Sequence, residues 1–380
     1  MRITFLLASL GSGGAERVVS LLANKMVERG HQVEIICLKF NDVYYQTDSR
    51  VKVTLAMEQT QNRLTEVYWL RKYLKKQNPD VVIPFTEGVY CFTILSLLGT
   101  GIPIIASERL DPAAMSKTRK ILKRLLLPFA DWLVVQTQSI KEYFPESIQK
   151  KTSIIYNPVN DEVFHQIENG ELKIENGERY KSPDGLQVQG ANAASSVQSS
   201  KLNRIISVGR LFPQKNQEMM IRAFAKVADE FPDWQLVIFG EGPLRAELES
   251  LVSSFKLQDR VLLPGRTEHV IEELRKSKIF CMSSDYEGMS NAMIEAICVG
   301  LPIISTKVSG TDELIQDGEN GLLVEIGNEK ILRGCMSNLM LSPTFREDMT
   351  SQNMKLSYLF NIDYIVEKWL NLINNVTYSR

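Results

Sequence analysis

Short apolar runs alternate with helix-like segments through most of the 380-residue chain. The first run, RITFLLASL, is followed by a glycine turn and by AERVVSLLANKMVERG, where Val18, Leu22 and Met26 recur at helical spacing. Parallel strands need such crossover segments, because a tight turn cannot join them. The alternation stops between residues 165 and 202 and then starts again. We therefore expect an α/β protein with two doubly wound parallel sheets.

The length of the chain also favours two domains, since a single core rarely organises this many residues. We place the first domain at 1–164 and the second at 203–360. The segment 165–202 is rich in Gly, Asn and Ser and has no sustained apolar face, which predicts a polar, flexible linker. Within it, Asn176-Gly177 suits the type I′ turn of a small hairpin.

The composition narrows the class of protein. A formal net charge of -1 argues against a nucleic-acid partner. The five cysteines form no CxxC, which favours reduced, buried thiols in a cytoplasmic protein. The start of the chain lacks a small-residue cleavage site and predicts a first buried strand instead of a signal peptide. No apolar stretch reaches the length of about 18 residues that a membrane-spanning helix needs.

Doubly wound sheets bind ligands beyond the carboxyl ends of their strands, so we expect the site in a cleft between the two domains. One candidate is SLGSGGAERVV, where the backbone at Gly14 can approach an anion at a helix N-terminus. It is not a dinucleotide fingerprint, because Glu16 stands at the third glycine position. A plain strand-to-helix turn is the alternative.

A second candidate is SVGRLFPQKNQ, at the end of an expected strand. Arg210 offers a guanidinium fork and Lys215 a point charge, and together these can neutralise a diphosphate. The alternative is that both are solvated loop charges.

The third candidate is SSDYEGMSNAMIEAICVG. Ser290 is a good cap for a helix, and the free N–H groups near Met289, Ser290 and Asn291 would attract phosphate. Glu295 lies about 6 Å further along the axis, where a carboxylate can bridge the hydroxyls of a ribose. Glu287 would face the group on the other side of the phosphate. A glycosidase acid/base pair is the alternative, but a helix N-terminus between two carboxylates favours an anionic substrate.

A basic amphipathic helix is predicted over 115–129. Its cations alternate with apolar residues, a pattern typical of helices that lie on anionic membranes. Packing of the apolar stripe against the sheet is the alternative. The cations are Lys117, Arg119, Lys120, Lys123 and Arg124.

Together these residues resemble the retaining glycosyltransferases of family 4, which have the GT-B fold of two Rossmann-like domains. EGMSNAMIE resembles the Glu-x7-Glu signature of that family. Five further segments resemble its other motifs, and all six follow one another along the chain as they do in the family. In chain order the five are GGAERVV, YNPVN, GRLFPQKNQ, GEGP and GTDELIQDGENGLLV. The resemblance covers nearly the whole chain outside the linker. It also implies that a C-terminal helix at 361–375 returns to the first domain.

The resemblance implies a role for each matching residue. Arg210 and Lys215 would hold the donor diphosphate, and Glu287, the third catalytic candidate, would contact the donor sugar. No metal or other cofactor is expected, because Arg, Lys and helix dipoles can stabilise a leaving diphosphate. The donor-binding set is Gly14, Gly209, Gly240, Gly265, Arg266, Val270, Met289, Ser290, Asn291 and Glu295.

One departure concerns the acceptor side. Many members of the family carry a His after the strand that corresponds to IPIIAS, whereas this chain has SERLDP there and only His31, His165 and His269 elsewhere. Glu108 or Arg109 would take that place, and a salt-bridged surface pair is the alternative.

The sequence thus predicts transfer of a hexose or N-acetylhexosamine from a nucleotide sugar, a UDP-sugar by our hypothesis, to a glycan hydroxyl with retention of configuration. The chain is similar to bacterial enzymes that extend lipid-linked or surface polysaccharide glycans. We expect a cytoplasmic protein that attaches peripherally to the inner face of the cytoplasmic membrane through 115–129. A GT-B epimerase or phosphorylase and a non-catalytic partner subunit are the alternatives.

Overall fold

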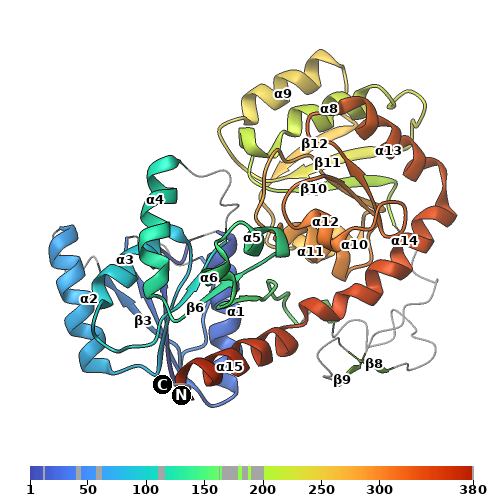
Figure 1. Cartoon of the computed structure of the whole chain (residues 1–380). Coiled ribbons are helices and arrows are strands. Elements are labelled where there is room, and N and C mark those ends of the chain that lie inside the picture. Colours follow the sequence, from blue (N-terminus) through green and yellow to red (C-terminus); the bar gives the residue numbers. More distant parts are fainter. Residues whose placement is uncertain are drawn as a thin grey trace. The chain divides into compact units, whose positions relative to one another are not determined.

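The computed structural model describes residues 1–11, 13–39, 44–56, 62–109, 116–161, 163–164, 179–181, 187–189 and 201–378. The chain divides into two compact units, unit 1 (Met1–Pro158 with Ile362–Arg380) and unit 2 (Val159–Asn361). Each unit has parallel strands connected by helices (Figure 1). The predicted α/β class is therefore confirmed.

Seven parallel strands occur in the described part of unit 1. β3, β2, β1 and β4 form one sheet in that order, and β5, β6 and β7 form another. Single bridges from Val82 to Ile104 and from Phe85 to Ser107 join β4 to β5. β1 carries five successive buried residues, as expected for a strand with both faces covered by helices. The strands are β1 (Arg2–Leu7), β2 (Gln32–Cys37), β3 (Lys52–Leu55), β4 (Val81–Pro84), β5 (Ile105–Ser107), β6 (Trp132–Val135) and β7 (Thr152–Ile154).

The helices of unit 1 include one from the far end of the chain. α15 (Ile362–Tyr378) lies against α1, and Arg29, directly after α1, donates hydrogen bonds to Asp363 and Glu367, both at 2.8 Å. Trp369 of α15 is fully buried and stacks on Phe85. The others are α1 (Gly14–Glu28), α2 (Arg63–Gln77), α3 (Glu87–Leu97), α4 (Lys117–Leu126), η3 (Leu127–Phe129), α5 (Gln138–Glu142) and α6 (Glu146–Gln149).

Unit 2 contains a six-stranded parallel sheet in the order β12-β11-β10-β13-β14-β15. The chain adds strands on one side of β10 and then continues on its other side with β13, which is the strand order of doubly wound nucleotide-binding folds. The strands are β10 (Arg204–Val208), β11 (Gln235–Phe239), β12 (Val261–Gly265), β13 (Ile279–Met282), β14 (Ile303–Thr306) and β15 (Gly321–Val324).

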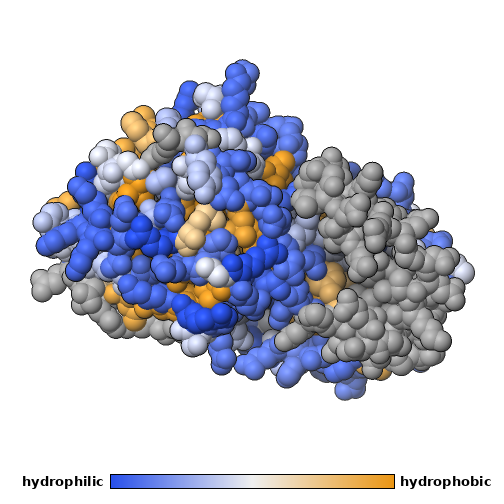
Figure 2. Space-filling view, turned by 90° about the horizontal axis from the view of Figure 1, so that it is seen from below, coloured by the Kyte–Doolittle hydropathy of each residue, from blue (hydrophilic) through white to orange (hydrophobic). Residues whose placement is uncertain are grey.

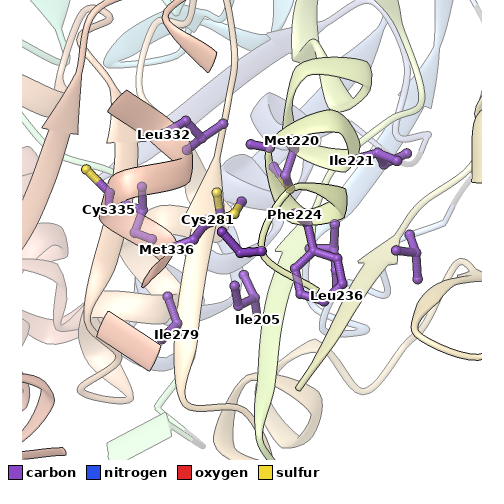
Figure 3. Packing of buried hydrophobic residues seen from close by; sticks show 14 of the residues in the cluster. Ile205, Met220, Ile221, Phe224, Leu236, Ile279, Cys281, Leu332, Cys335 and Met336 are labelled. Atoms are coloured by element: carbon purple, nitrogen blue, oxygen red, sulfur yellow. The ribbon is translucent and has the colours of Figure 1, made fainter. Parts of the chain in front are cut away.

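The core of unit 2 lies between this sheet and its helices. Figure 3 shows Ile205, Leu236 and Cys281 of the strands against Phe224 of α8 and Met336 of α13. Burial of such side chains stabilises the sheet and fixes the ends of its strands. The helices are η5 (Pro213–Lys215), α8 (Gln217–Ala225), α9 (Arg245–Ser254), α10 (Val270–Arg275), α11 (Asn291–Cys298), α12 (Thr311–Leu314), α13 (Glu329–Leu341), α14 (Pro343–Leu356) and η6 (Ser357–Phe360).

The predicted linker 165–202 lies largely outside the described residues. Two short strands within it, β8 (Arg179–Lys181) and β9 (Gln187–Gln189), pair antiparallel. The predicted turn Asn176-Gly177 also lies outside the described residues, and it precedes β8, so it does not join this pair.

The surface and the cysteines complete the description. On the face shown in Figure 2, hydrophilic residues prevail among the described residues, and hydrophobic residues lie in small separate patches. All five cysteines are buried and free, which confirms the predicted buried thiols. Among the described residues, no helix combines the length and apolar character that crossing a membrane requires.

Candidate functional site

The carboxyl ends of β10 and β13 are neighbours at the point where the strand order of unit 2 reverses. The loop after β10 leads through η5 to α8, and the loop after β13 leads to α11. Crevices at such reversals are the usual ligand sites of doubly wound sheets. The second and third candidate motifs of the sequence therefore lie beside one another.

Lys215 and Glu287 join these two loops directly. Lys215 Nζ forms an ion pair with Glu287 Oε1, and Ser284 Oγ donates to the same oxygen at 2.8 Å. Both charged side chains are largely buried. In such surroundings the attraction between the charges is stronger than in water, so the pair holds both groups in a fixed orientation.

A second set of contacts fixes the backbone of the same loops. Asn216 has a left-handed φ of 46°, caps α8 by accepting from Met219 N, and donates to Asp285 Oδ1 at 2.9 Å. Ser283 Oγ donates to Asn216 O at 2.8 Å. None of these residues is predicted above as part of a site, although an Asn directly before an apolar helical pattern is a recognisable capping signal.

Arg210 lies at the same edge of the sheet but outside this ion pair. Its side chain is exposed, with the guanidinium carbon 4.9 Å from the centre of the Phe212 ring. Within the described part of the chain, no carboxylate pairs with it. An exposed guanidinium of this kind is available to an anionic ligand.

Helix α11 directs its N-terminus toward the same strand ends. Ser290 caps it by accepting a hydrogen bond from Met293 N at 3.4 Å, as the sequence predicts. Met289 and Ser290 are buried, and Asn291 opens the helix. Glu295, one turn further along, is also buried. The N-terminal partial charge of the helix favours an anion at this position.

Three glycines bring the ends of β10, β11 and β12 into backbone contact. Gly240 has a φ of 151°, and a Cβ atom there would lie 1.9 Å from Gly209 O. Gly240 N donates to Gly265 O at 2.8 Å. Arg266 follows Gly265 with an exposed side chain, and Val270, which begins α10, is half-buried. The predicted donor-binding positions of unit 2 thus share one edge of its sheet.

The remaining predicted residues lie in unit 1. Gly14 begins α1, whose N-cap, Gly13, makes no side-chain capping bond. Glu108 and Arg109 follow β5 at the carboxyl edge of the sheet. The alternative of a salt-bridged surface pair is wrong, since both are buried. The ion-pair partner of Glu108 is Lys123, at 3.0 Å.

Arg109 is held by neutral groups. Its Nε donates to Ser107 Oγ and its Nη1 to Asn157 Oδ1, both at 2.7 Å. The guanidinium carbon lies 4.4 Å from the centre of the Phe85 ring. Burial lowers the pKa of Arg109 to about 9, although the charge of Glu108 opposes this shift.

Helix α4 occupies most of the predicted amphipathic segment 115–129, the first residue of which lies outside the described residues. Its orientation contradicts the alternative that the apolar stripe packs on the sheet, and it departs from the predicted basic surface at Lys123. Lys123 is buried, whereas Ile121, Leu125 and Phe129 are 61%, 63% and 60% exposed. Lys123 is therefore not part of an outward basic surface, and these apolar side chains do not pack on the sheet. Lys123 points inward because the buried carboxylate of Glu108 needs a partner of opposite charge.

Comparison with known proteins identifies the family. A model described as Glycosyl transferases group 1 matches residues 189–356, and one described as Glycosyltransferase Family 4 matches residues 12–163. A Campylobacter jejuni α-1,4-N-acetyl-D-galactosaminyltransferase, named for a diNAcBac-PP-undecaprenol substrate, is 30% identical over 99% of both chains. The chain belongs to glycosyltransferase family 4.

Two further relatives extend the comparison. This glycosyltransferase is 25% identical to the amylovoran biosynthesis glycosyltransferase AmsD of Erwinia amylovora, over 96% of each chain. The crystal structure of Anabaena HepE with UDP and glucose matches it with a TM-score of 0.78 at 17% identity, covering 98% of this chain and 99% of that one. The predicted family and the GT-B fold are therefore confirmed.

Proposed function

We propose that this glycosyltransferase moves a hexose or N-acetylhexosamine from a UDP-sugar to a hydroxyl of a lipid-linked glycan, with retention of the anomeric configuration. The observation that carries the proposal is the Lys215–Glu287 pair beside the N-terminus of α11, at the strand reversal of unit 2. Support comes from the UDP named in the HepE structure and the undecaprenol-linked substrate named for the Campylobacter relative.

The donor site would stabilise a leaving diphosphate. Arg210 supplies an exposed guanidinium, Lys215 a held ammonium, and Met289, Ser290 and Asn291 the backbone groups at the start of α11. Lys215 and the backbone at the start of α11 are held before the reaction, which is the condition for effective stabilisation of a developing charge. No metal is needed for this task in the proposed site.

The other donor contacts follow from the placement of the remaining residues. Glu295 would accept hydrogen bonds from the ribose hydroxyls, and Glu287 would orient the transferred sugar. Gly265, Arg266 and Val270 would line the base, and Gly209 and Gly240 keep the backbone close to the ligand. Gly14, at the start of α1, would favour an anion through the N-terminal partial charge of that helix.

Retention requires that the new bond form on the face from which the old one breaks. The bond between the anomeric carbon and the diphosphate oxygen breaks, and that oxygen takes the proton of the acceptor hydroxyl as the new glycosidic bond forms. The products are UDP and the extended glycan. Glu287 is tied to Lys215 and Ser284, which suits an orienting carboxylate better than a nucleophile.

The acceptor side would lie at a membrane. Helix α4 exposes Ile121, Leu122, Leu125 and the adjacent Phe129. Lys117, Arg119 and Arg124 are exposed beside them. Exposed apolar groups bordered by cations match an anionic bilayer, where hydrocarbon covers the apolar groups and headgroups meet the charges. We propose peripheral attachment at the inner face of the cytoplasmic membrane.

The donor is tested by thermal unfolding with a panel of nucleotide sugars. A ligand at 100 times its Kd adds about 2.7 kcal/mol of apparent stability, so one UDP-sugar should raise the Tm selectively. Glu295→Ala should abolish that shift. A shift with another nucleotide sugar, or none in the panel, contradicts the proposed donor. The anomeric configuration of the product, read by NMR, tests retention, and product formation without an acceptor would favour an epimerase.

Arg210→Ala tests the donor site kinetically. We expect turnover to fall by about 10²–10³-fold, the loss typical of one charge-stabilising group, with an unchanged Tm. Arg222→Ala is the matched control, since Arg222 is a half-buried residue of α8 paired with Glu218. Turnover near the wild-type value in Arg210→Ala would exclude the assigned role.

Membrane attachment is tested by co-sedimentation with vesicles of phosphatidylglycerol and phosphatidylethanolamine. The double variant Leu125→Glu/Phe129→Glu should stay in the supernatant. Leu341→Glu, at another exposed apolar residue, should sediment like the wild type. Equal binding by both variants contradicts the proposed lipid-facing surface.

A further inference from the structure

Two cations of helix α4 lie near carboxylates of the same unit, Lys123 from a buried position and Arg119 from an exposed one. Lys123 Nζ donates to Glu108 Oε2 at 3.0 Å, and Arg119 Nε lies 3.9 Å from Glu87 Oε2. Residues 119 and 123 are one helical turn apart and so share a face. Ile121 and Leu125, also one turn apart, are exposed. The helix therefore contacts its own unit through charged side chains and exposes apolar side chains on its surface.

The Lys123–Glu108 contact is deeply buried. The side chain of Glu108 is fully buried, that of Lys123 is 2% exposed, and Tyr90 Oη donates to the same Glu108 oxygen at 2.8 Å. Removing one partner from such a pair leaves an uncompensated buried charge, which is strongly destabilising. The position of α4 and the position of the Glu108 turn are consequently coupled.

That turn also carries Arg109. The backbone N of Arg109 donates to Glu108 Oε1 at 3.2 Å. The Nη2 of Arg109 is buried and has no hydrogen-bond partner among the described residues. Buried donors without partners are rare, and a substrate oxygen is one group that would satisfy this one.

The neighbouring backbone is strained. Thr86 has φ 73° and ψ 151°, a conformation that is costly for a β-branched residue. Its N donates to Ser107 O at 3.0 Å, and it stands between Phe85, which contacts Arg109, and Glu87, which faces Arg119. Such strain persists only where surrounding contacts enforce it, and it is frequent at functional sites.

We propose that Lys123 is a positioning residue that links the lipid-facing helix to the turn carrying Glu108 and Arg109. When a bilayer covers the apolar groups of α4, the ion pair transmits the ordering of the helix to this turn and fixes Arg109 for the acceptor. The inference rests on the proposed membrane attachment and adds the means by which attachment prepares the acceptor side.

Hydrogen exchange of the full chain, with and without phosphatidylglycerol–phosphatidylethanolamine vesicles at saturating lipid, tests the link. In the wild type, vesicles should slow exchange at the amides of Thr86 and Glu108 by about threefold or more, as expected when local opening is suppressed. Lys123→Met should bind the vesicles with unchanged affinity and lose this slowing, and Lys123→Arg should restore it. Arg124→Met, an exposed neighbour on α4, should keep it.

Because Lys123→Met leaves Glu108 unpaired, the double variant Lys123→Met/Glu108→Gln provides a neutral replacement of the pair. It should fold, bind vesicles and show no slowing. Slowing of wild-type size in the double variant, or in a folded Lys123→Met, overturns the proposal. Failure of the wild type to bind vesicles refutes the membrane attachment itself, and co-sedimentation in the same samples separates that outcome from the others.

Discussion

Lys215 and Glu287, 72 positions apart in the sequence, form an ion pair between the loops that follow β10 and β13. Ser284 donates to the same carboxylate oxygen, so one oxygen of Glu287 receives two hydrogen bonds. Each loop thereby fixes the other. The orientation of the proposed donor site depends on this contact as much as on either loop alone.

The first prediction concerns the charge of Lys215. Lys215→Met should lower turnover at saturating donor by about 10²–10³-fold, because a group that stabilises the leaving diphosphate is lost. Lys215→Arg keeps the charge and should retain more activity. Single-turnover kinetics measure the effect. Lys226→Met is the control, since Lys226 pairs with Glu329 in the same unit. Equal rates in the two methionine variants would contradict the role of Lys215.

The second prediction concerns the close approach of Gly240 to Gly209. Gly240→Ala should destabilise unit 2 by about 2–4 kcal/mol, since its Cβ would lie 1.9 Å from a backbone oxygen that cannot move freely. Gly334→Ala is the matched control. It lies within α13 with no atom within 4 Å of the added Cβ, so a gain of about 0.5–1 kcal/mol is expected. Urea unfolding measures both, and similar stabilities for the two variants would count against the close contact.

Strands, helices and helix caps could be predicted from the sequence more readily than the contacts between them. Apolar runs and helical spacing predicted the parallel sheets, because strand and helix periodicities are local properties. Ser290 was recognised as a cap for the same reason. The contact of Asn216 with Asp285 was missed, since it joins loops that no spacing relates.

Helix α4 illustrates the limit most clearly. Its pattern revealed an amphipathic helix, but periodicity alone does not say which face meets the core. The answer depends on Glu108, a buried charge on another element that attracts Lys123. Such a long-range charge pair has no signature in the sequence of either segment.

The third prediction concerns the start of α11. Ser290→Ala removes the cap and should cost about 1 kcal/mol of stability. Ser290→Asp keeps a capping oxygen but adds a negative charge where we propose a diphosphate, so it should preserve more stability and weaken UDP binding. Calorimetric titration with UDP distinguishes the two variants. Tight UDP binding by Ser290→Asp would place the diphosphate elsewhere.

The last prediction concerns pH and the attachment of α15. Burial raises the pKa of Asp363, but hydrogen bonds from Arg29 and Lys25 outweigh it and hold the pKa below its ordinary value of 3.8. The unfolded chain therefore binds the proton more readily than the folded one. The stabilisation from Asp363 is complete above pH 3.8 and is lost as the pH falls through the lower, folded pKa.

Asp363→Asn should consequently lower the Tm at pH 7, and the difference from the wild type should shrink as the pH falls below 3.8. Thermal unfolding of both proteins over this range measures the effect. Asp229→Asn, at an exposed residue with no ion pair among the described residues, should match the wild type throughout. A constant difference between Asp363→Asn and the wild type at all pH values would mean that the Asn change acts through packing of α15 on α1 and not through the charge of Asp363.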